Sequence, residues 1–204
     1  MRTVDIGGEA VAPSKILCVG RNYVAHIEEL GNEVPAQMVV FIKPNSAIGD
    51  TLHAARDGEP LHYEGELAFA VQGGRFAAVG FGLDLTRRAL QGTLKDKGLP
   101  WERAKAFDGA ALFSNFVPLP GEPDGLALRL EIDGAVRQAG DVALMIHKPA
   151  DILRELQSFT TLEDGDIVMT GTPAGVGEVA PGQHFRGSVL AGQRPLVAAN
   201  WRAR

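Results

Sequence analysis

The chain has 204 residues, of which 45% are hydrophobic and 22% are charged, and these values are those of an ordinary globular protein. Lysine and arginine number 20 against 25 aspartate and glutamate residues, so the formal net charge is −5, which argues against a nucleic-acid partner. The 25 glycines and 12 prolines show no period, which excludes a collagen-like chain and favours many short strands joined by tight turns.

Cysteine content and apolar runs define the expected compartment. Cys18 is the one cysteine in the sequence, so an internal disulfide and a multi-cysteine metal site are excluded. Its apolar neighbours predict core packing rather than catalysis. No apolar run approaches the roughly 18 residues of a membrane span, and the first residues lack the apolar centre of a signal peptide. We therefore expect a cytoplasmic protein without a membrane partner.

Apolar runs and capping signals predict the elements of the first half of the chain. Strands are expected at 16–20, 38–42 and 61–71. Asn22 is a suitable N-cap for a helix that reaches Leu30. Thr86 is a suitable N-cap for a second helix, which ends at Gly98.

The second half of the chain shows a hairpin, a helix and a glycine-rich turn. The stretch 126–132 alternates between apolar and polar residues and precedes Asp133-Gly134, the strongest hairpin signal in the sequence. Pro149 begins a helix with apolar residues at helical spacing. A strand at 166–170 leads into a turn at 171–177. Because no repeat, linker or low-complexity tract interrupts this pattern, we predict one α+β domain, rich in strands, with about three short helices.

Three carboxylates can form an oxygen-ligand site. The even positions of the stretch 61–67 are polar, so Glu64 and Glu66 share one face of the predicted strand, about 7 Å apart at Cα. Asp84 stands in an apolar segment, where a charge is expected to be partnered or bound. Carboxylate oxygens suit a hard cation such as Mg²⁺. The alternatives are a solvated outer face for the two glutamates and a helix N-terminal role for Asp84.

Further candidate residues lie on a predicted helix, in an apolar stretch and in the glycine-rich turn. His26 and Glu29 are three residues apart, so on a helix they can hydrogen-bond as a general base requires, although most such pairs are surface pairs. Lys105 lies among apolar residues, where it meets a substrate carboxylate or extends to solvent. The turn 171–177 lacks the Gly-Lys-Ser/Thr ending of a phosphate-binding loop, and its glycines favour the approach of backbone amides to a small anion.

Several motifs follow one another in a specific order. They are Gly20-Arg21-Asn22-Tyr23 with His26, Phe41-Ile42-Lys43-Pro44, His62-Tyr63-Glu64-Gly65-Glu66-Leu67, Leu83-Asp84-Leu85-Thr86, Gln91, the stretch 98–108, and the stretch 170–177. In this order they resemble the fumarylacetoacetate hydrolase superfamily over about residues 14–190. The length of the chain matches the small, single-domain branch, which includes acylpyruvate hydrolases and oxaloacetate decarboxylases.

The resemblance implies a fold of mixed β-sheets rolled around the active site, a single catalytic domain over residues 1–204, and usually a homodimer. It implies that one Mg²⁺ or Mn²⁺ is held by Glu64, Glu66 and Asp84. The implied catalytic residues are Lys105 and the dyad of His26 and Glu29, which lies on a lid. The residues implied to bind substrate are Arg21, Gln91, Gly171 and Thr172.

The activity implied by the resemblance is metal-dependent hydrolysis of acylpyruvate-type 2,4-dioxo acids, which releases pyruvate. Oxaloacetate decarboxylation needs the same metal but no water, and is a second activity of such a site. The small-molecule partner is therefore a 2-oxo acid. The alternatives are an isomerase or hydrolase of 2-oxo dienoates in aromatic catabolism, an inactive metal-binding homologue, and a Ca²⁺-dependent binding module.

The sequence departs from the family pattern at two places near the predicted metal ligands, and each departure predicts a structural difference. Gly65 replaces the apolar β-branched residue that relatives usually have, which predicts weaker packing of the strand at this position. The connection from Glu66 to Asp84 is shorter than in relatives, which predicts an altered edge of the metal site.

Overall fold

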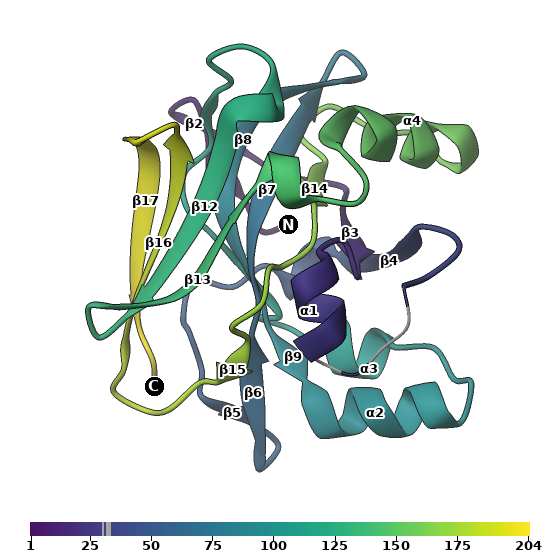
Figure 1. Cartoon of the computed structure of the whole chain (residues 1–204), viewed down its shortest axis with the longest axis vertical. Helices are drawn as coiled ribbons and strands as arrows, with labels where there is room; N and C mark the ends of the chain where they lie inside the picture. Colours follow the sequence, from purple (N-terminus) through teal and green to yellow (C-terminus); the bar gives the residue numbers. More distant parts are fainter. Residues whose placement is uncertain (30, 32–33) are drawn as a thin grey trace.

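The computed structural model describes residues 1–29, 31 and 34–204. Within these residues the chain forms a seven-stranded sheet, two four-stranded sheets and a two-stranded hairpin, with short helices around them (Figure 1). The predicted α+β class, rich in strands that form mixed sheets, is therefore confirmed.

The seven-stranded sheet lies at the centre of the fold. Its strands are β3 (Lys15–Gly20), β4 (Val39–Pro44), β7 (Gly65–Gln72), β8 (Arg75–Asp84), β10 (Ala111–Phe113), β11 (Val117–Pro118) and β14 (Ile167–Met169). Their order is β10-β8-β7-β14-β3-β4, and β11 also pairs with β8. β14 is parallel to β3 and antiparallel to β7. These three strands are buried on both faces, which explains why their sequences read as continuous apolar runs.

A four-stranded antiparallel sheet packs against this centre. It contains β12 (Leu126–Ile132), β13 (Ala135–Asp141), β16 (His184–Ala191) and β17 (Arg194–Arg202). The predicted hairpin is confirmed, because Asp133 (φ 51°) and Gly134 (φ 79°) join β12 to β13 with the positive values of a type I′ turn. The ring of Phe81 on β8 lies against Gly187 on β16, where no side chain fits. This contact allows the two sheets to approach closely.

The other strands form a small sheet and an N-terminal hairpin. The small sheet contains β5 (Ala55–Arg56), β6 (Glu59–Tyr63), β9 (Thr86–Arg87) and β15 (Gly177–Glu178), and the hairpin contains β1 (Val4–Ile6) and β2 (Glu9–Val11). The predicted strand at 61–71 is wrong in one respect, because it breaks at Glu64, where the chain passes from the small sheet into the seven-stranded sheet. The short connection from Glu66 to Asp84 is the β7–β8 hairpin.

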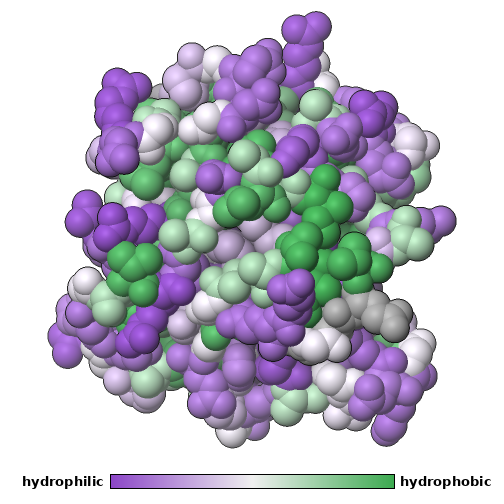
Figure 2. All heavy atoms as spheres, in the orientation of Figure 1, coloured by the Kyte–Doolittle hydropathy of each residue, from purple (hydrophilic) through white to green (hydrophobic). Residues whose placement is uncertain are grey.

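The helices surround the sheets. They are α1 (Val24–Glu29), α2 (Arg88–Asp96), α3 (Glu102–Lys105) and α4 (Pro149–Phe159), with 3₁₀ turns η1 (Asn45–Ala47), η2 (Pro123–Gly125) and η3 (Val142–Leu144). Figure 1 shows α2 and α3 together at the lower right and α4 at the upper right. Figure 2 shows apolar surface on the face that carries α1, where Val24 is 47% exposed. In the described part of the chain, no helix is long and apolar enough to cross a membrane.

Both predicted N-caps are wrong, because their side chains have other partners. Asn22 donates its amide hydrogens to the carbonyls of His147 and Thr170 and accepts a hydrogen bond from the His147 N–H, so it bridges distant segments. Thr86 belongs to β9, and α2 begins two residues later at Arg88. The predicted end of the first helix, Leu30, lies outside the described residues.

Asp166 joins the starts of the two parallel strands β3 and β14. Its buried carboxylate accepts hydrogen bonds from the backbone N–H groups of Ser14, Lys15 and Glu163. It also lies 2.5 Å from Lys15 Nζ. Burial alone would raise the pKa of Asp166, but these donors outweigh burial and hold the pKa below its usual value. Because the folded-state pKa is depressed, the carboxylate stabilises the fold above about pH 4, and this contribution is lost as the pH falls.

We expect Asp166→Ala to lower the free energy of unfolding by about 3 kcal/mol at neutral pH, since buried donors and Lys15 lose their partner. The difference from the wild type should shrink below about pH 4, and urea titrations at the two pH values measure it. The control is Asp164→Ala, which removes one exposed hydrogen bond from Gly73 and should cost about 1 kcal/mol. Equal effects of the two variants would contradict this role of Asp166.

Candidate active site

The three predicted metal ligands come together in the structure. Glu64 lies between β6 and β7, Glu66 is on β7 and Asp84 ends β8. The Asp84 backbone N–H donates to the Glu64 carbonyl at 2.8 Å. One oxygen from each carboxylate lies within 4.8 Å of the others, and the three residues are 7%, 2% and 1% exposed. The solvated face considered for the glutamates and the helix N-terminal role considered for Asp84 are therefore both wrong.

Cationic side chains surround these carboxylates. Lys105 Nζ lies 3.1 Å from Glu64 Oε2 and 2.6 Å from Asp84 Oδ2. Lys43 Nζ lies 2.8 Å from Asp84 Oδ1, and the Arg88 guanidinium pairs with Glu64. Lys105 is buried, so the alternative in which it extends to solvent is wrong.

Burial and neighbouring charges move the pKa values of these groups apart. Burial alone would raise the pKa of Glu64, but Lys105 and Arg88 outweigh burial and hold the pKa far below its usual range. Burial, reinforced by the charges of Asp84 and Glu64, raises the pKa of Glu66. Burial alone would lower the pKa of Lys105, but Asp84 and Glu64 outweigh it and raise that pKa. These surroundings favour the charged forms of Glu64 and Lys105 and disfavour the ionised form of Glu66.

The carboxylates fit a hard divalent cation. Both oxygens of Asp84 lie close to a lysine ammonium, yet neither receives a hydrogen bond of normal geometry from the described residues. A cation would also favour the ionised form of Glu66. Carboxylate oxygens are the ligands that Mg²⁺ and Mn²⁺ prefer. Glu64, Glu66 and Asp84 can therefore hold one such ion.

The glycine-rich turn contacts this cluster through Glu66 and Gly65. The Gly171 N–H donates to Glu66 Oε2 at 2.6 Å. The Thr172 hydroxyl donates to the Gly65 carbonyl at 2.9 Å and accepts a hydrogen bond from Gln138 Nε2 at 2.8 Å. Gly171 and Thr172 thus hold the ligand-bearing strand in place, and their contact with a substrate stays a prediction.

Gly65 is closely packed, so the expected loss of packing at this position is wrong. A Cβ atom there would lie 2.9 Å from Cζ of Phe81 and 3.1 Å from Oε1 of Gln138. The same Gln138 oxygen accepts a hydrogen bond from the Gly65 N–H at 2.8 Å. The volume that a β-branched side chain would fill is therefore taken by these two neighbours.

His26 and Glu29 lie on α1 and make the contact that their spacing predicts. His26 Nδ1 lies 3.3 Å from Glu29 Oε2. The Glu29 carboxylate also accepts a hydrogen bond from the Gly175 N–H at 3.0 Å. Gly175 has φ 100° and lies against the Arg137 carbonyl, so only glycine fits there. Glu29 therefore connects α1 and its histidine to the glycine-rich turn.

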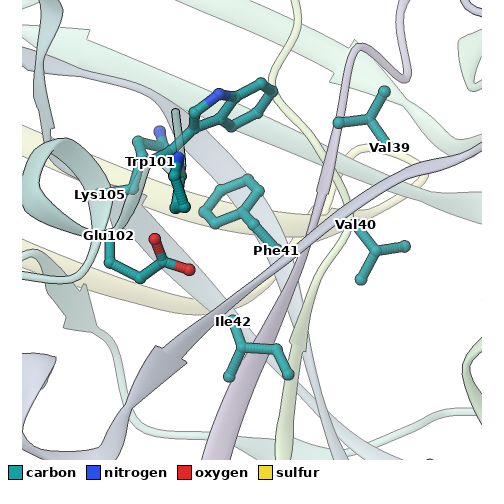
Figure 3. A pocket seen from close by; sticks show the side chains of 8 residues that line it. Val39, Val40, Phe41, Ile42, Trp101, Glu102 and Lys105 are labelled. Atoms are coloured by element: carbon teal, nitrogen blue, oxygen red, sulfur yellow. The ribbon is translucent and has the colours of Figure 1, made fainter. Parts of the chain in front are cut away.

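A narrow cavity of about 40 Å³ lies beside the carboxylates. The predicted site residues that line it are Arg21, His26, Glu64, Gln91 and Lys105. An apolar pocket of about 510 Å³ adjoins this cavity, and Phe41, Trp101 and Lys105 line both. Figure 3 shows Lys105 and Trp101 of this pocket facing Phe41 on β4. Phe41 and Trp101 thus separate a charged cavity from an apolar one.

Lys43, Arg88 and Lys95 also lie at the site, and none of the three was among the predicted site residues. Lys43 follows the apolar residues 39–42, so the argument that singled out Lys105 applies to it equally. Arg88 and Lys95 stand three residues before and four residues after Gln91. That spacing places them on one helix face, and it would have revealed them.

The comparisons with known proteins agree with this fold. The family model described as fumarylacetoacetate (FAA) hydrolase C-terminal matches residues 15–199. "Oxaloacetate tautomerase YcgM" of Escherichia coli is 42% identical over 84% of this chain and 86% of its own length. The mitochondrial "oxaloacetate decarboxylase" of Dictyostelium discoideum is 34% identical over 83% and 85%.

A crystal structure adds a relative with bound ligands. It is that of fumarylpyruvate hydrolase from Pseudomonas aeruginosa in complex with Mn²⁺ and pyruvate, with a TM-score of 0.87 and 32% identity over 100% of this chain and 96% of that one. The family model covers most of the chain, and the relatives cover more than four fifths of it. The chain therefore belongs to the fumarylacetoacetate hydrolase family.

Proposed function

We propose that the protein is a divalent-metal-dependent enzyme of short 2-oxo acids, with keto–enol tautomerisation of oxaloacetate as its main reaction. The observation that carries this proposal is the buried cluster of Glu64, Glu66 and Asp84 beside the Lys105 ammonium. A 2-oxo acid presents a carboxylate next to a carbonyl, and both are oxygen ligands. A bound Mg²⁺ or Mn²⁺ would supply Lewis-acid stabilisation of the negative charge that develops on the 2-oxo oxygen.

The residues of the chain supply the other parts of the reaction. Lys105, held by the Thr86 hydroxyl at 2.7 Å, places a positive charge where negative charge develops on the substrate. His26, held by Glu29, takes a proton from C3 of the keto form. The 2-oxo oxygen takes a proton from water as the enol forms, and His26 returns its proton to the solvent. The reverse sequence returns the keto form.

The names of the relatives favour oxaloacetate over other 2-oxo acids. The E. coli relative is named an oxaloacetate tautomerase and the D. discoideum relative an oxaloacetate decarboxylase. Both reactions develop negative charge on the 2-oxo oxygen of the same acid. One site of this kind would therefore serve both.

Hydrolysis of acylpyruvates is the second candidate, and the contact between His26 and Glu29 favours it. In this reaction water attacks the C4 carbonyl, the C3–C4 bond breaks, and pyruvate and a carboxylic acid leave. His26 would take the proton of the attacking water. The P. aeruginosa relative, a fumarylpyruvate hydrolase with bound pyruvate, supports this candidate.

His26→Ala separates hydrolysis, which needs an activated water, from decarboxylation, which does not. We expect this variant to lower acetylpyruvate hydrolysis about 100-fold or more, while oxaloacetate decarboxylation, which needs no activated water, falls less than about 10-fold. Mn²⁺ affinity should not change, because His26 is not among the three carboxylates. Steady-state kinetics with both substrates measure the ratio. An equal loss in the two reactions would contradict water activation by His26 in the hydrolysis.

A substrate panel tests the proposed function itself. The enol-to-keto conversion of oxaloacetate and the release of pyruvate from oxaloacetate, acetylpyruvate and fumarylpyruvate are measured with Mn²⁺ and with EDTA. Metal-dependent tautomerisation faster than any pyruvate release supports the leading proposal. Faster pyruvate release from acetylpyruvate or fumarylpyruvate supports the hydrolase, and faster release from oxaloacetate supports a decarboxylase. Metal binding without turnover, on this panel and on a 2-oxo dienoate, would identify an inactive homologue. The homodimer and the cytoplasmic location stay predictions.

A further inference from the structure

Lys95 is a half-buried cation without a role in the chemistry described above. It lines the narrow cavity together with Arg21, Arg88 and Lys105. Glu64 is the carboxylate among the described residues that line this cavity. The cavity wall is therefore rich in positive charge.

Helix α2 places Lys95 at the outer end of a row of polar side chains. Arg88, Gln91 and Lys95 are separated by three and four residues, so they lie along one face of the helix. Arg88 pairs with Glu64 and donates to the Gln91 side chain at 2.9 Å. Lys95 lies about 10 Å further along the helix axis than Arg88. The row thus leads from the carboxylate cluster to Lys95.

The charge of Lys95 is not neutralised within the described residues, where no carboxylate lies at ion-pair distance from its ammonium. Lys95 Nζ lies instead over the Trp101 ring, 4.8 Å from the centroid. Burial, reinforced by the charges of Arg21 and Arg88, lowers the pKa of Lys95 to about 8. A substrate carboxylate in the cavity would stabilise the charged form of Lys95 against the repulsion from these arginines.

With a divalent cation bound, the metal site would carry a net positive charge that a dianionic substrate can offset. The buried or half-buried cations Lys43, Arg88 and Lys105 lie at ion-pair distance from Glu64 and Asp84. In number they equal the three carboxylates of the cluster. A divalent cation therefore gives the site a surplus of positive charge, and Lys95 adds to it. A monocarboxylic 2-oxo acid would leave part of this surplus, whereas a dicarboxylic acid would remove more of it.

We propose, on the basis of the proposed function, that Lys95 binds the second carboxylate of the substrate and makes the site selective for dicarboxylic 2-oxo acids. The first carboxylate and the 2-oxo group face the Glu64, Glu66 and Asp84 cluster. The second carboxylate faces the Lys95 ammonium above Trp101. The alkyl end of a monocarboxylic acid has no such charged partner.

The test compares Lys95→Met with Lys95→Arg, which keeps the charge, and with Lys97→Met as the matched control. Lys97 is exposed and follows α2 at its C-terminal end. Turnover is measured with oxaloacetate and acetylpyruvate. Binding is measured by calorimetry in Mn²⁺ with 2-oxoglutarate and 2-oxopentanoate, which share a five-carbon chain and differ in the terminal carboxylate. The binding arm needs no turnover.

We expect Lys95→Met to lower kcat/KM for oxaloacetate and affinity for 2-oxoglutarate about 10- to 100-fold. For the monocarboxylic acids, kcat/KM with acetylpyruvate and affinity for 2-oxopentanoate should change less than about 3-fold. Lys95→Arg should restore most of the loss seen in Lys95→Met, and Lys97→Met should leave all of these values unchanged. Equal losses for both acid classes, or no loss, would overturn the role of Lys95 and leave the proposed function standing. A wild-type protein that binds neither acid in Mn²⁺ and does not turn over oxaloacetate would overturn the proposed function, and this inference with it.

Discussion

Glu64→Gln is expected to abolish measurable Mn²⁺ binding and to lower the turnover of 2-oxo acids by at least about 1000-fold. Glutamine keeps the shape of the side chain but removes its negative charge, and the remaining pair of Glu66 and Asp84 lies among cations. Two carboxylates so placed hold a divalent ion poorly. Calorimetric titration with Mn²⁺ and steady-state kinetics measure the two effects.

The matched control for this variant is Glu59→Gln. Glu59 pairs with Arg87 at 2.9 Å and accepts a hydrogen bond from the Leu90 N–H at 3.1 Å, and it is not part of the carboxylate cluster. Its replacement should leave Mn²⁺ affinity and turnover near the wild-type values. Wild-type metal affinity in Glu64→Gln would show that this carboxylate is not a ligand.

Lys105→Met is expected to change metal affinity and turnover in opposite directions. The Lys105 ammonium lies at 3.1 Å from Glu64 and 2.6 Å from Asp84, so it competes with a metal ion for the same carboxylates. Without it, Mn²⁺ should bind about 10-fold more tightly. Turnover should nevertheless fall about 100- to 1000-fold, because the positive charge that stabilises the transition state is lost.

Thermal denaturation with and without Mn²⁺ provides a second measurement for Lys105→Met. The metal-free variant has buried carboxylates without their partner and should melt at a lower temperature, and Mn²⁺ should raise its Tm by more than that of the wild type. The control is Lys148→Met, which removes a lysine bound to backbone carbonyls of 142–145. A Lys105→Met protein that loses metal binding together with activity would contradict the proposed competition.

Local signals made the three carboxylates candidates, and the family resemblance joined them into one predicted ligand set. Alternation along 61–67 places Glu64 and Glu66 on one face, and Asp84 is a charge in an apolar segment. The break at Glu64 could not be predicted, because the same alternation continues on both sides of it while the strand changes partners from β9 to β8. Strand pairing over such distances leaves no periodic trace in the sequence.

The residues that were missed or misjudged depend on distant partners. Lys43 meets Asp84, which is 41 residues away in sequence. Gly65 is packed by Phe81 and Gln138, so its effect on the strand depends on side chains from two other strands. Asn22 fits the pattern of an N-cap, yet its amide bonds to residues more than a hundred positions away. Local propensity gives way to such contacts when the tertiary structure offers them.

The most direct test of metal-dependent chemistry on a 2-oxo acid is the rate of oxaloacetate tautomerisation as a function of Mn²⁺ concentration, starting from protein stripped with EDTA. We predict no rate above the spontaneous one without metal, saturation with one ion per chain, and no response in Glu64→Gln. A full rate from protein shown by elemental analysis to contain no metal, unchanged in Glu64→Gln, would contradict the proposed function.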